Sequence, residues 1–336
     1  MDSTGWDDMR IVVDKTWFGL GGIGRFSEEV IARLSYDADC KLSCHPASFM
    51  ASAKLSRSCK RNMVAFLPGF VPPAISFGSY VFTIHDLNHL DRPENSSLGK
   101  RLFYRFVIRR GCKKAYAILT VSEFSRKRIV EWAGVSSDKV VNVGNGVDKS
   151  FNSDVIPYNL GTPYYLCVGN RKAHKNETRV VEAFAQADID EGIHLVFTGA
   201  SEPSLEAMIQ EHNLSSRVKF MGTVTEDELP SLYKGARGLL FPSLYEGFGL
   251  PVLEAMACGT PVITSNCTSL PEVAGDAAML VDPLDTQELQ DAIERLEQDA
   301  SLRDELIVKG FDRAKLFTWE KTAQKVQEVL DSARNA

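Results

Sequence analysis

The sequence predicts an α/β protein of two domains, and three observations support this class. The chain has 336 residues, of which 44% are hydrophobic, and this suits two cores of about 150 residues each. Short apolar runs of strand length alternate along it with helical segments, an order typical of α/β domains. Residues 149–162 are rich in Asn, Ser, Pro and Gly and indicate a linker. We therefore expect domains at 9–150 and 163–317, with a last segment at 318–336.

The first domain is expected to start at the apolar run after Met9, so residues 1–8 would form a disordered extension. The polar start Met1-Asp2-Ser3 does not resemble a signal peptide. The patterns predict strands at Arg10–Asp14, Tyr80–Ile84, Ala117–Val121 and Val140–Val143. They predict helices at about Gly22–Ser35 and at Lys100–Lys114, and a third that begins with Ser122 as its cap.

The second domain repeats the alternation of strand and helix. Strands are expected at Tyr164–Val168, His194–Thr198, Val218–Gly222, Gly238–Phe241 and Pro261–Thr264. Helices are expected from Glu226 to Tyr233, over 251–257, twice within Asp285–Val308, and at Trp319–Ala333.

Composition excludes several classes of protein. No apolar run is long enough to cross a bilayer, and the seven cysteines are odd in number and lack C-x-x-C spacing, which favours reduced thiols in a cytoplasmic protein. Residues 1–150 carry 22 Lys and Arg against 15 Asp and Glu, a net charge of +7, whereas the remainder carries 16 against 29, a net charge of −13. With an acidic whole and no nucleic-acid-binding motif, we expect no nucleic-acid partner.

The stretch from Phe241 to Glu272 predicts an anion site. It is predicted to be a buried strand, a loop that contains Gly247 and Gly249, a helix that starts at Pro251, and a second strand. Such a loop directs unpaired amide N–H groups and the positive end of a helix dipole at one point. We therefore expect this loop to hold a phosphate or diphosphate.

Two glutamates, Glu246 and Glu254, flank that loop. Carboxylates accept hydrogen bonds from hydroxyls, and a nucleotide sugar carries hydroxyls on either side of its diphosphate. The alternative for each glutamate alone is local: Glu246 caps a turn, and Glu254 complements the helix dipole. The Gly-x-Gly-x-Pro sequence between them favours the nucleotide-sugar interpretation.

The run E-G-F-G-L-P-V-L-E-A-M-A-C-G-T-P-V-I, residues 246–263, resembles the E-x7-E signature of the retaining GT-B glycosyltransferases of family GT4. The segment Ser269–Pro283 and the runs V-S-E-F-S and N-G-V-D resemble the same family. The resemblance covers nearly all of the chain after Met9. It implies a GT-B fold, in which two Rossmann-like domains face each other across a cleft, with donor on the second and acceptor on the first. It also implies that the last helix crosses back to the first domain.

A cationic loop, Gly169–Asn176, follows the first strand of the second half. Cations in such a loop can neutralise a diphosphate, and the alternative is that they are ordinary solvated charges. The loop resembles the family's phosphate loop, in which Lys175 matches the lysine closely. Arg171 is our choice for the arginine, although Lys172 is one residue away.

For the donor, the resemblance implies that Glu246 accepts hydrogen bonds from the sugar and Glu254 from the ribose. The cations Arg171 and Lys175 are also implied to contact the donor. The remaining implied contacts come from the amides of the turn and from two glycines close to the ligand. The turn amides are those of Phe248, Gly249 and Leu250, and the two glycines are Gly22 and Gly222. Catalytic roles are implied for His85, Glu246, Arg171 and Lys175, of which the two cations would stabilise the leaving phosphate.

His85 and Asp86 follow the strand Tyr80–Ile84, at the edge where parallel sheets bind ligands. A strand-end histidine is usually structural, but the family's H-D pair implies that His85 lies beside the transferred sugar. The run Gly19–Gly24 fits G-x-G-x-x-G, yet four residues separate it from the strand, so a glycine loop of GT4 type is favoured over a dinucleotide site. Arg25 and Asp86 are the candidate acceptor residues.

The resemblance implies transfer of a hexose from a nucleoside diphosphate to a hydroxyl of a glycan or lipid-linked acceptor, with retention and an α-glycosidic bond. The resemblance implies a reaction without a metal, because retaining GT-B enzymes generally work without one, and we identify no D-x-D pair that would hold a metal. We expect no cofactor. GDP-mannose is the first expectation for the donor, since relatives with a similar loop look like bacterial mannosyl- or rhamnosyltransferases of surface polysaccharides. UDP-glucose is the runner-up. A nucleotide-sugar epimerase or hydrolase, an NAD-dependent enzyme and a non-catalytic binder remain alternatives.

The predicted helix Lys100–Lys114 contains seven basic residues, interleaved with Leu102, Phe103, Phe106 and Val107. One interpretation is a surface helix that packs through this apolar stripe. The other is docking on an anionic membrane surface or a lipid-pyrophosphate acceptor.

Overall fold

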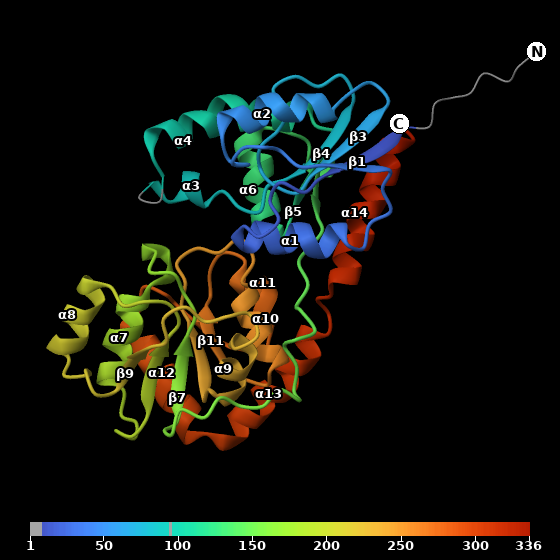
Figure 1. The fold of residues 1–336 in the computed structure, drawn as a ribbon. Coiled ribbons are helices and arrows are strands. Elements are labelled where there is room, and N and C mark those ends of the chain that lie inside the picture. The colour runs from blue at the N-terminus through green and yellow to red at the C-terminus, as the bar shows by residue number, and fades with distance from the viewer. Residues whose placement is uncertain (1–8, 94–95) are drawn as a thin grey trace, which may run out of the picture. The chain divides into compact units, whose positions relative to one another are not determined.

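The computed structural model describes residues 9–93 and 96–336, and the chain forms two compact units (Figure 1). The first unit extends to Gly146 and also includes Thr318–Ala336, and the second is Val147–Phe317. Each unit contains one parallel sheet with helices around it, which confirms the predicted α/β class. The extension expected at residues 1–8 lies outside the described residues.

The sheet of the first unit has the strand order β2-β1-β3-β4-β5-β6, and every pairing in it is parallel. Its strands are β1 (Arg10–Asp14), β2 (Ala38–Cys40), β3 (Met63–Leu67), β4 (Ser79–Thr83), β5 (Ala117–Thr120) and β6 (Val140–Asn142). The inner strands are almost continuously apolar and buried, as expected of a parallel sheet that is covered on both faces.

Helices of the first unit come from both ends of the chain. They are α1 (Gly21–Ile31), α2 (Phe49–Leu55), α3 (Asn88–Asp91), α4 (Leu98–Phe103), α5 (Arg109–Lys114), α6 (Glu123–Ala133) and α14 (Trp319–Arg334). A π-helical turn, Tyr104–Ile108, joins α4 to α5. Helix α14 packs against α1 and against β1, β3 and β4, and its first residue, Trp319, meets Phe26 of α1 edge to face. The C-terminal helix is therefore part of the first unit.

The second sheet has the order β12-β11-β10-β7-β8-β9, again wholly parallel. Its strands are β7 (Tyr164–Cys167), β8 (His194–Phe197), β9 (Val218–Phe220), β10 (Gly238–Phe241), β11 (Val262–Ser265) and β12 (Met279–Val281). Its helices are α7 (Glu177–Gln186), α8 (Pro203–Glu211), α9 (Leu229–Gly235), α10 (Leu250–Ala257), α11 (Leu270–Ala274), α12 (Thr286–Gln298) and α13 (Ala300–Ala314).

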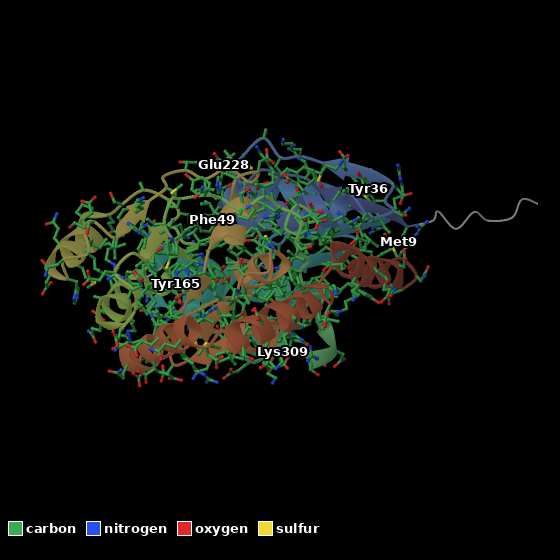
Figure 2. The ribbon with its side chains drawn as sticks, turned by 90° about the horizontal axis from the view of Figure 1, so that it is seen from below. Met9, Tyr36, Phe49, Tyr165, Glu228 and Lys309 are labelled. Atoms are coloured by element: carbon green, nitrogen blue, oxygen red, sulfur yellow. The ribbon has the colours of Figure 1, made fainter. Side chains whose placement is uncertain are left out.

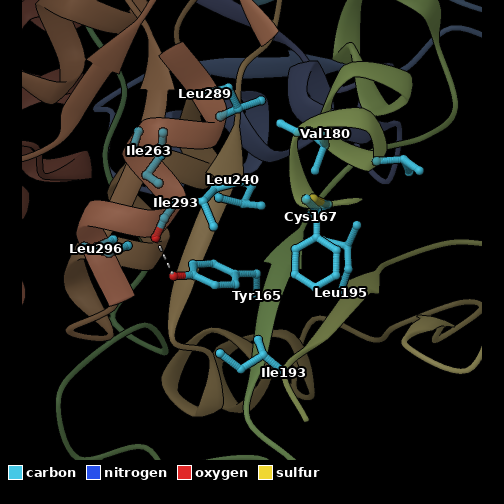
Figure 3. Packing of buried hydrophobic residues seen from close by; sticks show 14 of the residues in the cluster. Tyr165, Cys167, Val180, Ile193, Leu195, Leu240, Ile263, Leu289, Ile293 and Leu296 are labelled. Carbon is cyan, nitrogen blue, oxygen red and sulfur yellow. Dashed lines mark hydrogen bonds between the residues drawn. The ribbon is translucent and has the colours of Figure 1, made fainter. Parts of the chain in front are cut away.

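The core of the second unit lies between its sheet and the helices α7, α8 and α12 (Figure 3). Tyr165 of β7 places its ring among aliphatic side chains, and its hydroxyl donates to Glu297 at 2.8 Å. Charged side chains lie outside this core: Lys309 of α13, labelled in Figure 2, pairs with Glu305 one turn earlier at 2.8 Å. Burial of the apolar faces supplies the main stabilisation of such a unit.

Candidate functional site

The order of strands in the second sheet identifies one ligand-binding edge. Strands β8 and β9 extend the sheet on one side of β7, and β10, β11 and β12 extend it on the other. The loops that follow β7 and β10 therefore leave the sheet in opposite directions, which opens a crevice at their carboxyl ends. The cationic loop follows β7, and the loop of Glu246 follows β10. The fold thus brings the two predicted halves of the donor site together.

The turn before α10 has the geometry expected of an anion site. Gly249 precedes the helix with φ of +113°, a conformation that suits glycine, and Pro251 occupies the first turn. A Cβ on Gly249 would lie 2.7 Å from the Leu270 side chain, so the position has no room for one. Phe248 in this turn is buried, and its ring meets that of Phe317 edge to face. The amides of 248–250 are thus held at the positive end of α10.

Lys175 and Glu246 form the central ion pair of this edge. The ammonium group of Lys175 lies 2.8 Å from Glu246 Oε1 and 4.7 Å from the centre of the Phe241 ring. The two charged side chains are 15% and 14% exposed, so they are largely shielded yet still reachable from solvent. In this low-dielectric position the pair is held more firmly than a surface pair.

Asn176 ties the lysine loop to the glutamate loop. Its side-chain amide donates to the carbonyl oxygen of Pro242 at 3.0 Å and to that of Pro283 at 2.7 Å. Its backbone has φ of +59°, a conformation that asparagine tolerates better than most residues. The N–H of Leu244 donates to the carbonyl of His174 at 2.7 Å, which closes the connection.

Glu254 lies on the buried side of α10 and is only 5% exposed. The hydroxyl of Tyr233, which is itself fully buried in α9, donates to Glu254 Oε2 at 2.9 Å. The carbonyl of Tyr233 in turn accepts a hydrogen bond from Thr260 at 2.6 Å. One oxygen of the carboxylate is thus oriented by the protein.

Arg171 has φ of +58°, and its guanidinium group points back into the second unit. It pairs with Glu177 at 2.8 Å, donates to the carbonyls of Thr198 and Ala200, and lies over the rings of Phe197 and Phe220. Burial raises the pKa of Glu177, and the guanidinium beside it opposes that shift. Arg171 is thus heavily engaged within the fold, and its contact with phosphate stays a prediction. Lys172 next to it is exposed.

Gly222 follows β9, and its carbonyl accepts a hydrogen bond from the N–H of Gly199 at 2.7 Å. It has φ of +65°, and no atom lies within 4 Å of the place where a Cβ would stand. This backbone is therefore accessible for the predicted contact with a base.

In the first unit, His85 follows the carboxyl end of the inner strand β4. Its Nε2 lies 3.0 Å from the carbonyl oxygen of Pro68, which can only accept, so the proton is on Nε2. The ring of Phe26 meets the imidazole edge to face, with ring centres 4.9 Å apart. Burial lowers the pKa of His85 to about 4, although the bond to Pro68 opposes this. His85 is therefore neutral near pH 7, with Nδ1 as an acceptor.

The other predicted residues of the first unit lie near the ends of β1 and β4. Asp86 accepts a hydrogen bond from the N–H of Asn88 at 2.9 Å, which shapes the loop after His85. Gly22 is an exposed residue in the first turn of α1, and Arg25 is partly exposed one turn later. Glu28 secures the loop before them by accepting from the N–H of Gly19 at 2.7 Å.

Comparison with known proteins assigns this arrangement to a family. Residues 148–313 match the family described as Glycosyl transferases group 1, and residues 68–151 match Glycosyltransferase Family 4. The O-antigen chain mannosyltransferase B of Escherichia coli is 32% identical over 258 residues, which cover 71% of this chain and 67% of that protein. The chain belongs to the group 1 glycosyltransferases of family GT4.

Other relatives of this glycosyltransferase support the same assignment. The O-antigen chain mannosyltransferase RfbU of Salmonella typhimurium is 33% identical over 218 residues, which cover 64% of this chain and 60% of that protein. The match to the serotype-specific mannosyltransferase WbdA of Escherichia coli, at 30% identity, covers 72% of this chain but only 32% of WbdA.

Solved structures confirm the GT-B fold of the glycosyltransferase. Alr3699/HepE of Anabaena, solved with UDP and glucose, superimposes with a TM-score of 0.77 at 18% identity and covers 96% of this chain and 100% of that one. WaaG, a glycosyltransferase involved in lipopolysaccharide biosynthesis, gives a TM-score of 0.73 at 16% identity over 95% and 99% of the two chains.

Sequence reasoning missed several residues that hold the site of the glycosyltransferase in place. Tyr233 orients Glu254, Asn176 joins two loops, and Thr268 and Ser269 bind the turn of Glu246. The pair E-x7-E contains no information about these partners, because they come from other loops. A signal was available only for Asn176, which directly follows the predicted lysine.

Residues 9–93 and 96–336 contain neither a metal-binding cluster nor a membrane-spanning helix. No cluster of three His, Cys, Asp or Glu side chains there could hold a metal ion. No helix in these segments is sufficiently long and apolar to span a bilayer. The expectation of a metal-free reaction stays a prediction.

Proposed function

We propose that this glycosyltransferase moves a hexose, with mannose as the first candidate, from a nucleoside diphosphate to an acceptor hydroxyl with retention at the anomeric carbon. One observation carries the proposal: Lys175 and Glu246 meet at 2.8 Å beside the N-terminus of α10, at the crevice of the second sheet. A cation and helix amides suit a diphosphate, and the adjoining carboxylate suits a sugar hydroxyl. Mannose is preferred because the relatives at 32% and 33% identity are mannosyltransferases by name.

In this proposal the residues of the second unit stabilise the leaving group. Lys175 and the amides of 248–250 lie where negative charge grows on the diphosphate as the anomeric bond breaks. Glu246 exchanges part of its contact with Lys175 for a hydrogen bond from the sugar. Glu254, oriented by Tyr233, accepts from the ribose. The bond from the anomeric carbon to the diphosphate oxygen breaks, and a bond from the anomeric carbon to the acceptor oxygen forms. The proton of the acceptor hydroxyl goes to the leaving phosphate.

In this proposal His85 forms a hydrogen bond with the transferred sugar. Because its Nε2 proton is bound to Pro68, its Nδ1 can accept a hydrogen bond from a sugar hydroxyl but cannot donate one. The low pKa keeps it in this form at neutral pH.

A thermal-shift panel tests the donor. GDP, UDP, ADP and dTDP and their sugars are added in turn, and a ligand that binds the folded state raises the melting temperature. We expect GDP and GDP-mannose to give the largest shift, with UDP and UDP-glucose as runner-up, and the shift to disappear in Lys175→Ala and Glu254→Ala. Lys315→Ala, which changes an exposed lysine at the end of α13, serves as the control. An unchanged shift in both site variants would contradict the assignment.

The reaction class needs a second measurement. Incubation with the preferred donor and a mixture of polyprenyl-linked and free glycans should consume donor faster than incubation without acceptor. An epimerase would convert the sugar nucleotide without acceptor, and a hydrolase would release free sugar at the same rate in both. A shift with NAD alone would support the dinucleotide alternative.

We further propose that the enzyme docks on an anionic membrane through its first unit. One of the two interpretations of the sequence was a helix that packs through the stripe Leu102, Phe103, Phe106 and Val107, but the stripe is divided. Phe103 is buried and Val107 partly so, whereas Leu102 and Phe106 are exposed, Phe106 by 64%. Phe106 lies within the π-helical turn Tyr104–Ile108, and Leu102 lies in α4 before it.

The exposed apolar side chains lie among cations. A pocket of about 210 Å³ between α2 and α4–α5 is lined by Phe49, Phe106, Arg110 and Lys114, and Phe49 is 68% exposed. Of the seven basic residues of 100–114, all but Lys100 are exposed. Aromatic side chains surrounded by cations match the interface of an anionic lipid layer, and each cation near the surface contributes about 1 kcal/mol.

Vesicle sedimentation tests this surface. The protein should sediment with phosphatidylcholine vesicles that contain phosphatidylglycerol but not with phosphatidylcholine alone, and high salt should release it. Phe106→Ser and Arg110→Glu should reduce binding without a change in nucleotide affinity, whereas Lys315→Ala should bind normally. Equal sedimentation of all variants would exclude this face as the contact.

A further inference from the structure

Two consecutive hydroxyl side chains hold the turn that carries Glu246. Ser269 is fully buried, and its hydroxyl shares its one proton between two carbonyl oxygens, that of Glu246 at 2.9 Å and that of Phe248 at 2.8 Å. The N–H of Glu246 donates to Thr268 Oγ1 at 3.3 Å. Both backbone polar groups of Glu246 are therefore bound by the loop that follows β11.

Thr268 makes this contact from a conformation that threonine rarely adopts. Its φ of +58° lies in the left-handed region, where a β-branched side chain meets steric resistance. Such residues persist only where the surrounding structure fixes them, and they gather at functional sites. Here the start of α11 follows immediately, with Ser269 as its first flanking residue. The loop thus keeps a strained residue in contact with the turn of Glu246.

Neighbouring hydroxyls bind other parts of the chain. Thr264 Oγ1 donates to the carbonyl of Phe241 at 2.9 Å, and Ser265 Oγ donates to that of Ser243 at 2.7 Å. These bonds join the ends of β11 and β10, before the turn begins. Thr268 and Ser269 differ from them because they reach Glu246 itself.

We propose that Thr268 and Ser269 are positioning residues, which fix the direction of the Glu246 carboxylate toward the transferred sugar. Neither side chain is assigned a contact with substrate; each acts through the backbone of Glu246. The inference rests on the proposed function, because it takes Glu246 to bind the donor sugar. It predicts that loosening this turn weakens recognition of the sugar but leaves recognition of the diphosphate to Lys175 and the helix amides.

Calorimetric titration with GDP and GDP-mannose tests Thr268. Thr268→Gly removes the hydroxyl and suits the left-handed backbone, so its melting temperature should be no lower than that of the wild type. Its Kd for GDP-mannose should rise about tenfold, as for the loss of a hydrogen bond to a charged group, while its Kd for GDP stays unchanged. Thr268→Ser keeps the hydroxyl and should restore the affinity for GDP-mannose.

Ser269→Ala and Ser265→Ala form a matched pair. Each removes one buried hydroxyl that donates to a carbonyl, so the melting temperatures should fall by similar amounts. Only Ser269→Ala should weaken GDP-mannose binding relative to GDP. Unchanged GDP-mannose affinity in Thr268→Gly, or an equal loss for GDP and GDP-mannose, would overturn the inference. Failure of the wild type to bind GDP at all would instead refute the proposed donor.

Discussion

Lys175 and Glu246 lie 2.8 Å apart although 70 residues separate them in the chain, and each side chain is the other's charged partner at the donor edge. The pair explains how the site stays ordered before a donor binds. Neither charge is left alone in a partly buried position, where an unpaired charge is expensive. In the proposed function, the diphosphate of the donor would take over the contact with Lys175, and its sugar the contact with Glu246.

The Lys175–Glu246 ion pair predicts that variants of its two residues differ in their effect on nucleotide binding. Lys175→Ala should abolish nucleotide binding and lower the free energy of unfolding by about 1–3 kcal/mol, because Glu246 loses its partner. Glu246→Gln should keep GDP binding but lose the preference for the sugar nucleotide. Urea denaturation of both variants and of the double variant gives the coupling energy. Strictly additive losses would show that the two side chains are independent.

Arg171 should behave differently from Lys175. Its guanidinium is paired with Glu177 and covered by Phe197 and Phe220, so Arg171→Ala should destabilise the protein by about 3 kcal/mol at pH 7. The loss should be smaller at pH 5 than at pH 7, because burial raises the pKa of Glu177 and removal of the guanidinium raises it further, so the variant buries a larger fraction of neutral carboxyl as the pH falls. Lys172→Ala is the control.

The measurements for Arg171 are urea denaturation at pH 5 and 7 and titration with GDP below the melting temperature. Glu177→Gln in the same chain should recover most of the lost stability. A normal melting temperature together with a complete loss of GDP binding would place Arg171 in the phosphate site, as the sequence alone suggested.

The fold class was predictable because the inner strands are continuous apolar runs such as Tyr164–Cys167 and Gly238–Phe241. Strands β2, β3 and β12 were not predicted. For β2 the reason is its sequence: Ala38–Cys40 is a short edge strand that is only partly buried, so it lacks an apolar pattern. The helix Lys100–Lys114 was located correctly, but its π-helical turn was not foreseen. Phe106, which lies within that turn, is exposed.

For the candidate site, the sequence supplied the charged residues because each lies in a local pattern: Lys175 in the loop between β7 and α7, and Glu246 and Glu254 around the turn between β10 and α10. It could not supply the direction of Arg171, because that direction depends on Phe197 and Phe220, which are distant in the chain. Tyr233, Thr268 and Ser269 were missed for the same reason: a hydroxyl acquires its partner only when two loops meet.

His85 predicts a specific dependence of stability on pH. Its pKa is about 4 in the folded protein and about 6.5 in an unfolded chain, so the unfolded state takes up a proton first as the pH falls. The free energy of unfolding should therefore fall between pH 6.5 and 4, at most by about 1.4 kcal/mol per pH unit from this residue.

Urea denaturation at pH 7, 6 and 5 measures this contribution. His85→Gln, which keeps an N–H donor for Pro68, should give a flatter profile than the wild type. Sugar-nucleotide binding by the wild type should be constant from pH 6 to 8. A step in binding near pH 6.5 that is absent in His85→Gln would show that the histidine titrates normally and is not buried as neutral imidazole.

The contact between Tyr233 and Glu254 predicts how the enzyme recognises ribose. If Glu254 accepts from the ribose hydroxyls, wild-type protein should bind GDP more tightly than 2′,3′-dideoxy-GDP, by about tenfold for a hydrogen bond to a charged group. Glu254→Gln should bind both nucleotides equally. Tyr233→Phe removes only the hydroxyl that orients Glu254 Oε2, and it should reduce the ratio of the two Kd values while Lys175 still holds the diphosphate. The same ratio in the wild type and Glu254→Gln would mean that Glu254 supports α10 and α9 and does not touch the nucleotide.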